Sequence, residues 1–566
     1  MIPETGERIF NNDYVDLFIH FPRDLEYFER FTDATVQLLD LMTAVVRIPS
    51  TYLDNSTISK YGYSAVPILS GIVDQADLEA SGITRLRNIP NLNLRGQGVL
   101  IGILDTGIDY TNPIFRYPDN TTKIAALWDQ TIYGENYSTN TYYGTEYTRE
   151  QINQALQSQN PYEIVPSRDE IGHGTMLAGI AAGNEVPEKG FSGVTPDAEL
   201  VIVKLKPAKQ NLKDFWKIPT DAVCYQSNDI AFALEYLEIT ANKLGRPMSI
   251  CVALGSSQGP HDNSLILNYL LSLRSENLNF TITIAGGNEG NARRHYYSVI
   301  DPSIGYDTVE LKVGNNEKGF SMELWGDSPG LFAMDITSPS GEYISRIIPR
   351  VNEYFKVSFI FDNTIILIDY QVVEAQSGDQ LILLRFSDPA PGIWTFHIYG
   401  KGDLSLSFHI WLPMDGFISG DTFFLKSDPD TTLLSFANAT EPITVTSYNT
   451  ANDSLYLNVS KGYTRTGNIK PEIAAPGVNI TSPNLDQGFS PVSGTSPAAA
   501  FISGVAAIIL EWGIVNGNLP LIKTSDVKGL MIRGARRDPT LTYPNQDWGY
   551  GILNVYHIFE SLRSSI

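Results

Sequence analysis

The sequence GVLIGILD, residues 98–105, is an apolar run that ends in one carboxylate, Asp105. A strand that is covered on both faces of a parallel sheet has this near-continuous apolar character. Similar runs recur further along the chain, at residues 200–203, 250–254 and 282–285. Between them, Ser227-Asn-Asp229 precedes a helical pattern that begins at Ile230 and supplies polar capping residues at its start. This alternation of strand and helix predicts an α/β domain with a doubly wound parallel sheet.

Changes of pattern divide the chain into four zones. We expect a small α+β unit, a first α/β part, an inserted β-sandwich and a second α/β part, over residues 1–75, 76–291, 292–430 and 431–566. In the first zone, strands are expected at 43–49 and 65–69, with a short helical stretch near 57–60. Eight short strand-like segments separated by turns predict that the insert is a jelly roll. These segments are 306–313, 320–326, 331–338, 354–361, 365–373, 381–386, 394–399 and 404–412.

The composition excludes several classes of protein. The 566 residues carry 63 acidic and 40 basic side chains, a net charge of −23, which argues against binding to nucleic acid or to an anionic membrane. No uninterrupted apolar stretch reaches the roughly 18 residues of a membrane span, and the first residues lack the basic and apolar regions of a signal peptide. We therefore expect a soluble protein made without an export signal. Its two cysteines, Cys224 and Cys251, are expected to be core thiols rather than a disulfide.

Three short segments carry reactive side chains at the ends of predicted elements. Asp105 follows the apolar strand, His173 opens a predicted helix after Gly172, and Ser496 directly precedes an apolar helix over about 497–512. Acyl transfer needs a hydroxyl nucleophile, a base that accepts its proton and an acid that orients the base, and these residues supply one of each. Taken singly, the segments have other interpretations. The Asp-Thr-Gly motif would also fit a metal or nucleotide site or half of an aspartic protease.

A fourth segment, Ala285-Gly-Gly-Asn288-Glu-Gly290, ends the last buried strand of the second zone. The side-chain amide of Asn288 can donate to the oxyanion of a tetrahedral intermediate, and the backbone N–H of Ser496 is a second donor. A helix N-terminus behind Ser496 favours the same negative charge. The order Asp, His, Asn, Ser therefore describes a complete set of groups for peptide hydrolysis.

In this order of motifs the chain resembles the subtilases, the subtilisin-like serine proteases, over about residues 76–291 and 431–560. The resemblance extends to Gly193-Val-Thr-Pro-Asp-Ala-Glu-Leu200 and Lys470-Pro-Glu-Ile-Ala-Ala-Pro-Gly-Val478. It implies that Asp105 orients the imidazole, that His173 is the general base and acid, that Ser496 attacks the peptide carbonyl and that Asn288 completes the oxyanion hole. It also implies that the substrate, a protein or peptide, pairs with the strand that contains Leu254, Gly255 and Ser256.

Two positions depart from the subtilase pattern without removing a reactive group. Met176 stands where the family often has a second histidine, and Phe501 stands where a histidine usually follows the nucleophile. The loop 183–189 does not look like the calcium loop of the secreted bacillar enzymes. We therefore expect no metal there, and no cofactor elsewhere.

The short N-terminal unit, the inserted sandwich and the missing signal peptide resemble the layout of the clostridial Csp germination proteases and their relatives. This resemblance implies that residues 1–75 are a prodomain, that the chain cuts itself between Ser64 and Ala76, and that the prodomain stays bound non-covalently. It also implies a monomer, located in the cytoplasm or associated with a spore, that activates a cortex hydrolase during germination. The alternatives are a protease-like binding or signalling protein with little turnover, and a carbohydrate-binding protein built around the sandwich.

Overall fold

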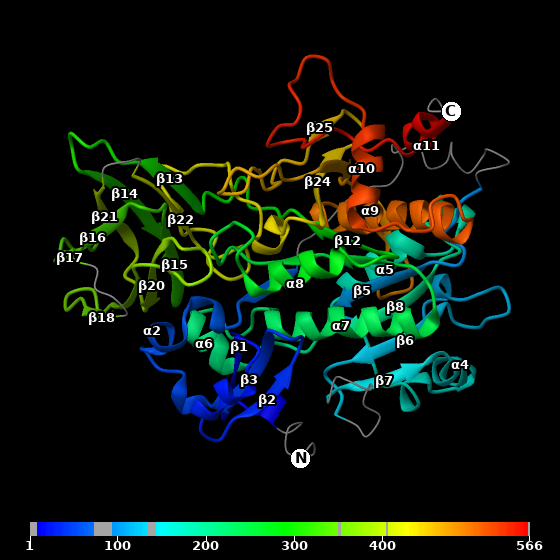
Figure 1. The fold of residues 1–566 in the computed structure, drawn as a ribbon, viewed down its shortest axis with the longest axis horizontal. Helices are drawn as coiled ribbons and strands as arrows, with labels where there is room; N and C mark the ends of the chain where they lie inside the picture. The colour runs from blue at the N-terminus through cyan, green and yellow to red at the C-terminus, as the bar shows by residue number, and fades with distance from the viewer. Residues whose placement is uncertain (1–7, 73–92, 134–142, 349–352, 403–405, 564–566) are drawn as a thin grey trace.

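A computed structural model describes residues 8–72, 93–133, 143–348, 353–402 and 406–563. Its centre is a nine-stranded, mostly parallel sheet of order β25-β24-β12-β10-β5-β8-β6-β7, with β26 paired to β24 (Figure 1). The four apolar runs predicted as buried strands form β5, β8, β10 and β12 of this sheet. The strands are β5 (Leu100–Asp105), β6 (Ile124–Asp129), β7 (Thr145–Thr148), β8 (Glu199–Lys204), β10 (Met248–Val252), β12 (Phe280–Ala285), β24 (Ile443–Asn449), β25 (Ser454–Leu455) and β26 (Ile473–Pro476).

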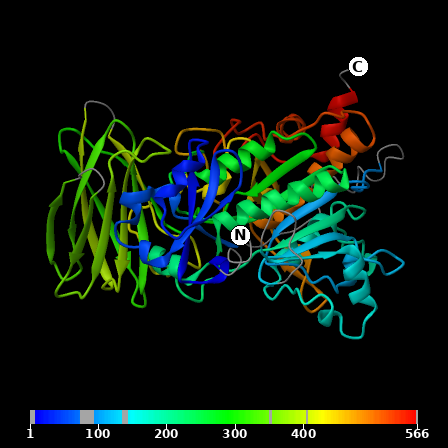
Figure 2. The same cartoon turned by 60° about the horizontal axis from the view of Figure 1, so that its bottom comes forward.

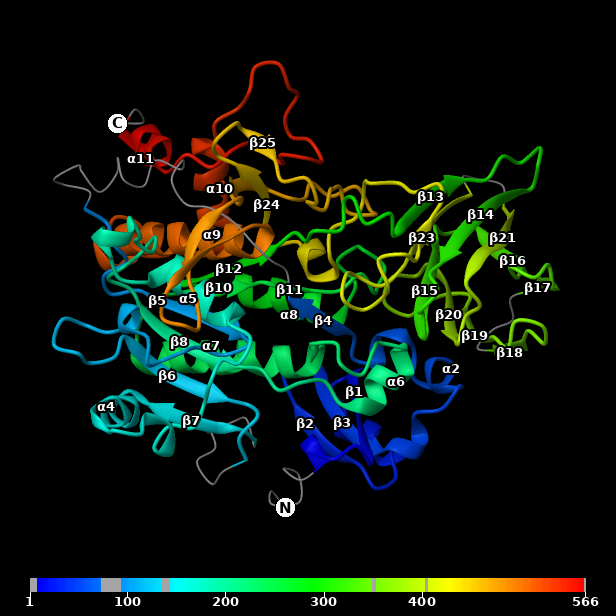
Figure 3. The same cartoon turned by 180° about the vertical axis from the view of Figure 1, so that it is seen from behind.

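Helices cover both faces of this sheet, as a doubly wound fold requires (Figures 1 and 3). Side chains in β5 alternate between the two faces: Leu100 and Leu104 join the core beneath α7 and α8, whereas Ile101 and Ile103 join the core beneath α5 and α9. This alternation explains why the strand is apolar throughout. The helices are α4 (Arg149–Gln157), α5 (His173–Ala182), α6 (Gln210–Trp216), α7 (Ser227–Leu244), α8 (Ile266–Ser275), α9 (Thr495–Leu510), α10 (Thr524–Gly534) and α11 (Val555–Arg563).

The zone expected as an insert forms two antiparallel sheets that enclose one apolar core. One sheet has the order β13-β22-β15-β20-β19-β18 and the other has the order β17-β16-β21-β14-β23. All eight predicted strands are present, and three short ones (β13, β17 and β23) were not predicted. The bounds are β13 (His295–Val299), β14 (Tyr306–Val313), β15 (Gly319–Gly326), β16 (Leu331–Thr337), β17 (Tyr343–Ile347), β18 (Glu353–Ser358), β19 (Ile365–Gln371), β20 (Gln380–Ser387), β21 (Gly392–Lys401), β22 (Ser407–Trp411) and β23 (Phe423–Phe424).

The N-terminal unit contains a three-stranded antiparallel sheet, order β1-β3-β2, and the short helix α2. It lies between the sandwich and the α/β domain (Figure 2) and shares its core with α7 and α8. Its elements are β1 (Tyr14–His20), β2 (Thr35–Leu38), β3 (Thr43–Pro49), α2 (Thr57–Tyr61) and β4 (Leu69–Ile72).

The expected strand at 65–69 was wrong. Residues Tyr63–Ala65 form a turn of 3₁₀ helix, and the strand β4 begins only at Leu69. Pro67 lacks the N–H that a ladder needs, and β4 forms where the chain meets two partner strands. The expected boundary at 75/76 lies outside the described residues.

Both cysteines are buried and unpaired, as predicted. Burial raises the pKa of both thiols. Among the described helices, the run Thr495–Val515 is long and apolar enough to cross a membrane, but 83% of its apolar window is buried inside the protein. This degree of burial is typical of a core helix.

Candidate active site

Asp105 and His173 meet where a strand ends and a helix begins. Asp105 is the last residue of β5 and His173 is the first residue of α5. The carboxylate Oδ1 of Asp105 lies 2.8 Å from Nδ1 of His173, and both side chains are buried. The same oxygen accepts a hydrogen bond from the backbone N–H of Thr106 at 2.7 Å. The carboxylate therefore fixes the imidazole so that Nε2 is the nitrogen turned away from the strand.

The start of α5 is docked directly on the loop after β5. The backbone N–H of Gly174 donates to the hydroxyl of Thr106 at 2.9 Å. A Cβ atom at Gly174 would collide with the carbonyl oxygen of Gly107. The glycine after His173 is thus required by close approach of two backbone segments, and this approach holds the acid and the imidazole at hydrogen-bonding distance.

Asp169 is a positioning residue that the sequence analysis missed. Its carboxylate accepts from the N–H groups of Gly172 (2.7 Å) and Thr175 (2.9 Å), which flank His173. The hydroxyl of Thr175 also donates to Asp169 at 2.7 Å and accepts from the N–H of Asp109 at 2.9 Å. The carboxylate thus connects the chain before His173 to the first turn of α5. A lone Asp in a polar run before a predicted helix start was the signal for this role.

Ser496 is the second residue of α9 and is fully buried. Its Oγ lies 3.5 Å from the carbonyl oxygen of Ala253, directly before the strand predicted to bind substrate. Ser496 is thereby held at the N-terminus of a 16-residue helix, where backbone N–H groups lack helical partners and carry partial positive charge.

Asn288 lies beside this helix start, just beyond the end of β12. Its side-chain oxygen accepts from the N–H of Thr495 at 3.2 Å, and the Thr495 hydroxyl accepts from the N–H of Gly287 at 3.0 Å. The first bond turns the donor end of the Asn288 amide away from the Thr495 N–H, and the second ties the start of α9 to the segment that carries Asn288. The sequence-predicted oxyanion donor therefore stands next to Ser496 with a defined orientation.

The predicted substrate strand is paired with the N-terminal unit of the same chain. Leu254 and Gly255 form β11 (Leu254–Gly255), which pairs antiparallel with β4 at Ile72 and Gly71 (Figure 3). On its other edge, β4 pairs with β9 (Tyr225–Gln226), so that β4 is the central strand of a three-stranded sheet. An extended segment thus fills the position predicted for a bound peptide.

Ser256, the third residue predicted for this strand, is engaged differently. Its carbonyl oxygen accepts from the N–H and the hydroxyl of Ser435, at 2.7 and 2.6 Å. In the described residues, the ladder with β4 therefore ends at Gly255.

The loop 183–189 is held by side chains of this protein. The buried ammonium of Lys123 donates to the carbonyls of Ala182 (2.6 Å) and Pro196 (2.5 Å) and to Oδ1 of Asn184 (3.2 Å). Burial lowers the pKa of Lys123 to about 7. Within the described ranges, no group of three or more His, Cys, Asp and Glu side chains is arranged to hold a metal ion.

Known proteins resemble this chain in sequence and in fold. The Subtilase family (Peptidase_S8) matches residues 96–309 and 424–551. The structure of the CspB protease of Clostridium perfringens superposes with a TM-score of 0.75 and 28% identity, covering 85% of this chain and 98% of that one. The PII-type proteinase of Lacticaseibacillus paracasei is 23% identical over 80% of this chain, and the subtilisin-like protease SBT3.6 of Arabidopsis thaliana is 24% identical over 81%.

The chain therefore belongs to the subtilase family of serine proteases. It spans about a quarter (24%) of the length of the lactic proteinase and 62% of the plant protease.

Proposed function

We propose that this protein is a serine endopeptidase that cuts peptide bonds through an acyl-enzyme. The observation that carries the proposal is the 2.8 Å contact between Asp105 Oδ1 and His173 Nδ1. Asp105 ends β5, and Ser496 lies beside Ala253, just beyond the end of the neighbouring parallel strand β10. With Nδ1–H donated to the carboxylate, Nε2 of the imidazole is the nitrogen that can accept a proton.

In the proposed reaction, Ser496 Oγ bonds to the substrate carbonyl carbon while His173 Nε2 takes the hydroxyl proton. The negative charge that develops on the carbonyl oxygen is stabilised by the Asn288 amide and by N–H groups at the start of α9. The imidazolium then gives its proton to the leaving amine, and the C–N bond breaks. Water repeats the two steps, which releases the acid and restores Ser496.

We further propose that the N-terminal unit is a prodomain from which the chain cuts itself. The support is the ladder of β4 with β11, because Ala253, whose carbonyl lies 3.5 Å from Ser496 Oγ, directly precedes β11. Within the expected interval from Ser64 to Ala76, this register favours a bond that follows Ile72. Residues 73–76 themselves lie outside the described residues.

Contacts between the units support retention of the prodomain after cleavage. Asp16 of β1 is fully buried and lies 3.1 Å from Lys209 Nζ and 2.9 Å from Gln226 Nε2, both in the α/β domain. From the insert, Gln371 donates to the carbonyl of Ile58 at 2.8 Å.

We propose that the insert is a jelly roll, since β14 pairs with β21 and β15 with β20 in nested order. We also propose that the protein acts as a monomer.

The test is the intact mass of the wild-type protein beside Ser496→Ala. We expect a wild-type chain split after residue 72, with both pieces eluting together in gel filtration, and an unsplit variant. Two uncut masses, with no cleavage of added peptides, would instead favour the second candidate, a protease-like binding or signalling protein. A carbohydrate-binding role predicts glycan retention by both proteins.

We also propose a setting in spore germination, with a cortex hydrolase precursor as substrate. The support is the shared layout with the CspB protease, which the superposition covers almost completely. Incubation with such a precursor should shorten it in a Ser496-dependent manner. A precursor that stays intact beside a peptide that is cut would separate this setting from the endopeptidase activity itself.

A further inference from the structure

The inserted sandwich reaches the cleft through the loop between β22 and β23. Met414 and Phe417 of this loop are 3% and 2% exposed and belong to the same core as Leu254 and Leu434. A cavity of about 630 Å³ is lined both by this loop and by residues of the candidate active site. Its lining includes Gly71, Ile72, Asn288, Leu434, Met414 and Phe417.

Gly71 of β4 lies against this loop. A Cβ atom at this position would lie 3.3 Å from Cε and 3.4 Å from Sδ of Met414, and 3.4 Å from Cε1 of Phe417. All three distances are below the 3.5–4.0 Å optimum for carbon contacts, so the Met414 side chain must shift to admit a Cβ and must shift further to admit γ atoms in that direction. A β-branched residue, which places two γ atoms around Cβ in few rotamers, has the least freedom to avoid both side chains.

The loop is anchored beside Asn288 by two buried charged side chains, Glu289 and Arg294, which contact its exposed residue Asp415. The carboxylate of Glu289 accepts from the N–H of Asp415 at 3.0 Å and pairs with Arg294 at 3.0 Å. Arg294 in turn pairs with Asp415 at 3.0 Å. Within the turn, the N–H of Phe417 donates to the carbonyl of Met414 at 3.1 Å. The loop that carries Met414 and Phe417 is therefore anchored to the same segment as Asn288, the proposed oxyanion donor.

Strands on both sides prevent the peptide backbone from moving away from Met414 and Phe417. On the β11 side, a Cβ at Gly255 would meet the Leu434 side chain at 2.5 Å, so Leu434 packs directly against the strand. On the other side, Ser70 of the peptide segment is paired with Tyr225 of β9. A segment in this position is thus held between two strands, with one residue facing Met414 and Phe417.

We propose that the insert sets substrate specificity: Met414 and Phe417 form a subsite that admits glycine at the substrate residue opposite Gly255 and excludes β-branched residues there. This inference rests on the proposed peptidase function. It places two specificity-determining residues on the insert, outside the α/β domain. The preferred substrates are extended segments with a glycine at that position, as in Leu69-Ser70-Gly71-Ile72 of the chain itself.

The first experiment adds synthetic peptides that copy residues 62–80 to the full-length protein. Because residues 69–72 of the chain occupy the same position, each peptide must displace them, a step common to all the peptides compared. We expect Gly71→Val in the peptide to lower kcat/KM at least tenfold and Gly71→Ala to lower it less. Val66→Leu, outside β4, is the matched control and should leave the rate within twofold. When the protein carries Met414→Ala, the peptide with Gly71→Val should regain most of the loss. Equal rates for the parent peptide and the peptide with Gly71→Val would overturn the subsite.

A second experiment separates this inference from the peptidase proposal. Gly71→Val is placed in the full chain with Ser496→Ala, which removes turnover, and the midpoint of thermal unfolding is compared with and without Met414→Ala. We expect Gly71→Val to lower the midpoint and Met414→Ala to reverse part of the loss, whereas Gly529→Val, on an exposed part of α10, should show no such coupling. If peptides are not cut at all, the peptidase proposal fails, and the comparison of the two single variants with the double variant still tests the contact between residue 71 and Met414. Additive effects of Gly71→Val and Met414→Ala on the midpoint would overturn that contact.

Discussion

Asp169 acts on the reaction through the chain around His173. Three donors from Gly172 and Thr175 converge on its buried carboxylate. In Asp169→Ala these donors lose their partner, and the imidazole can shift relative to Ser496. Since a misplacement of about 1 Å can cost roughly 100-fold in rate, we expect kcat to fall 10- to 100-fold with little change in KM.

Steady-state kinetics with a peptide substrate measure this effect. Asp169→Asn keeps one acceptor oxygen and should recover part of the kcat that Asp169→Ala loses. A general loss of stability would not be reversed in this way. Asp119→Ala is the control, because Asp119 accepts similar bonds from Thr121 on the exposed surface. A large rise in KM at unchanged kcat would contradict a positioning role.

Asn288 contributes at the site where charge develops. In Asn288→Ala one oxyanion donor is lost, and we expect kcat to fall about 100- to 1,000-fold, the range known for removing such a donor from subtilisin, a member of the same family. KM should change little, because the donor acts mainly on the transition state. The control is Asn518→Ala, whose amide donates to the Trp512 carbonyl on the exposed surface. A loss below threefold would remove Asn288 from the mechanism.

At this scale the sequence predicted residues whose signal is local. Asp105 ends an apolar run and His173 and Ser496 open apolar helices, so each can be located from its own neighbours. Asp169 and Met414 could not be found in this way. Their roles depend on partners that meet only after folding, and Gly71 lies 343 positions before Met414 in the chain.

At the scale of elements, β15 of the insert joins all three parts of the molecule through Glu323. Its carboxylate accepts from the hydroxyl of Tyr63 in the N-terminal unit at 2.8 Å and from the N–H of Gly259 in the α/β domain at 2.9 Å. Trp325 of the same strand donates to it at 3.1 Å. Burial raises the pKa of Glu323 from 4.5 to about 7, although these donors oppose the shift.

A pH dependence of the assembly between the N-terminal unit and the rest of the chain follows. Between pH 4.5 and 7 the assembled protein holds a proton on Glu323 that the separated or unfolded chain releases. The assembly is therefore most stable below pH 4.5 and loses stability as the pH rises through 7, by at most about 1.4 kcal/mol per pH unit, the value for one proton. Burial raises the pKa of Tyr63 well above its usual value, so its phenol stays protonated throughout.

The measurement is the urea midpoint of the Ser496→Ala chain at pH 5, 6, 7 and 8, compared with the same chain carrying Glu323→Gln. We expect the difference between the two to change with pH in the stated direction. The variant Glu374→Gln is the control, since Glu374 also reaches the N-terminal unit, where its carboxylate accepts from the Ser64 hydroxyl at 3.1 Å. Parallel midpoints for Glu323→Gln and the parent chain would rule out titration of this group.

The elements also show where sequence patterns reach their limit. The buried strands β5, β8, β10 and β12 are apolar throughout, and alternation marks the sandwich strands, so their periodicity predicted them. The strand β4 was misplaced by about four residues because its position is set by β9 and β11. The short strands β13, β17 and β23 have two to five residues, too few to establish a period.

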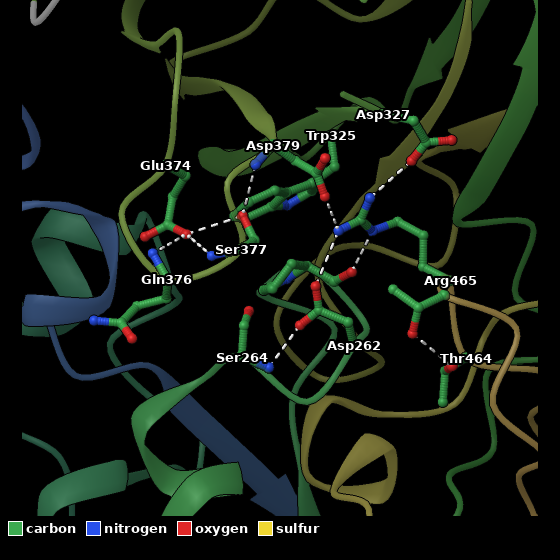
Figure 4. Close-up of polar contacts among 12 residues, drawn as sticks. Asp262, Ser264, Trp325, Asp327, Glu374, Gln376, Ser377, Asp379, Thr464 and Arg465 are labelled. Atoms are coloured by element: carbon green, nitrogen blue, oxygen red, sulfur yellow. Dashed lines mark hydrogen bonds and ion pairs between the residues drawn. The ribbon is translucent and has the colours of Figure 1, made fainter. Parts of the chain in front are cut away.

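At the scale of the whole molecule, one arginine ties the insert to the α/β domain. Arg465 is 2% exposed and pairs with Asp262 at 3.0 Å in its own domain (Figure 4). It also pairs with Asp327 at 2.8 Å and Asp379 at 2.6 Å, both from loops of the insert. Removing this cation leaves three neighbouring carboxylates without their shared partner. The interface between the two parts therefore depends on this side chain.

We expect Arg465→Met to destabilise this interface by about 3 kcal/mol, the low end of the cost of removing one partner from a buried ion pair, because Asp327 is 34% exposed and regains some hydration. The readouts are the free energy of unfolding and the rate of trypsin cleavage between the insert and the α/β domain. Arg536→Met is the matched control: the side chains of Arg536 and its partner Asp453 are 47% and 51% exposed, and their pair should contribute less than about 1 kcal/mol.

Because Met414 and Phe417 are carried by the insert, loosening the interface should also raise the rate at which peptides with valine opposite Gly255 are cut, relative to peptides with glycine there. An unchanged ratio, together with a lower stability, would show that the loop around Met414 is held by Glu289 and Arg294 independently of the rest of the insert.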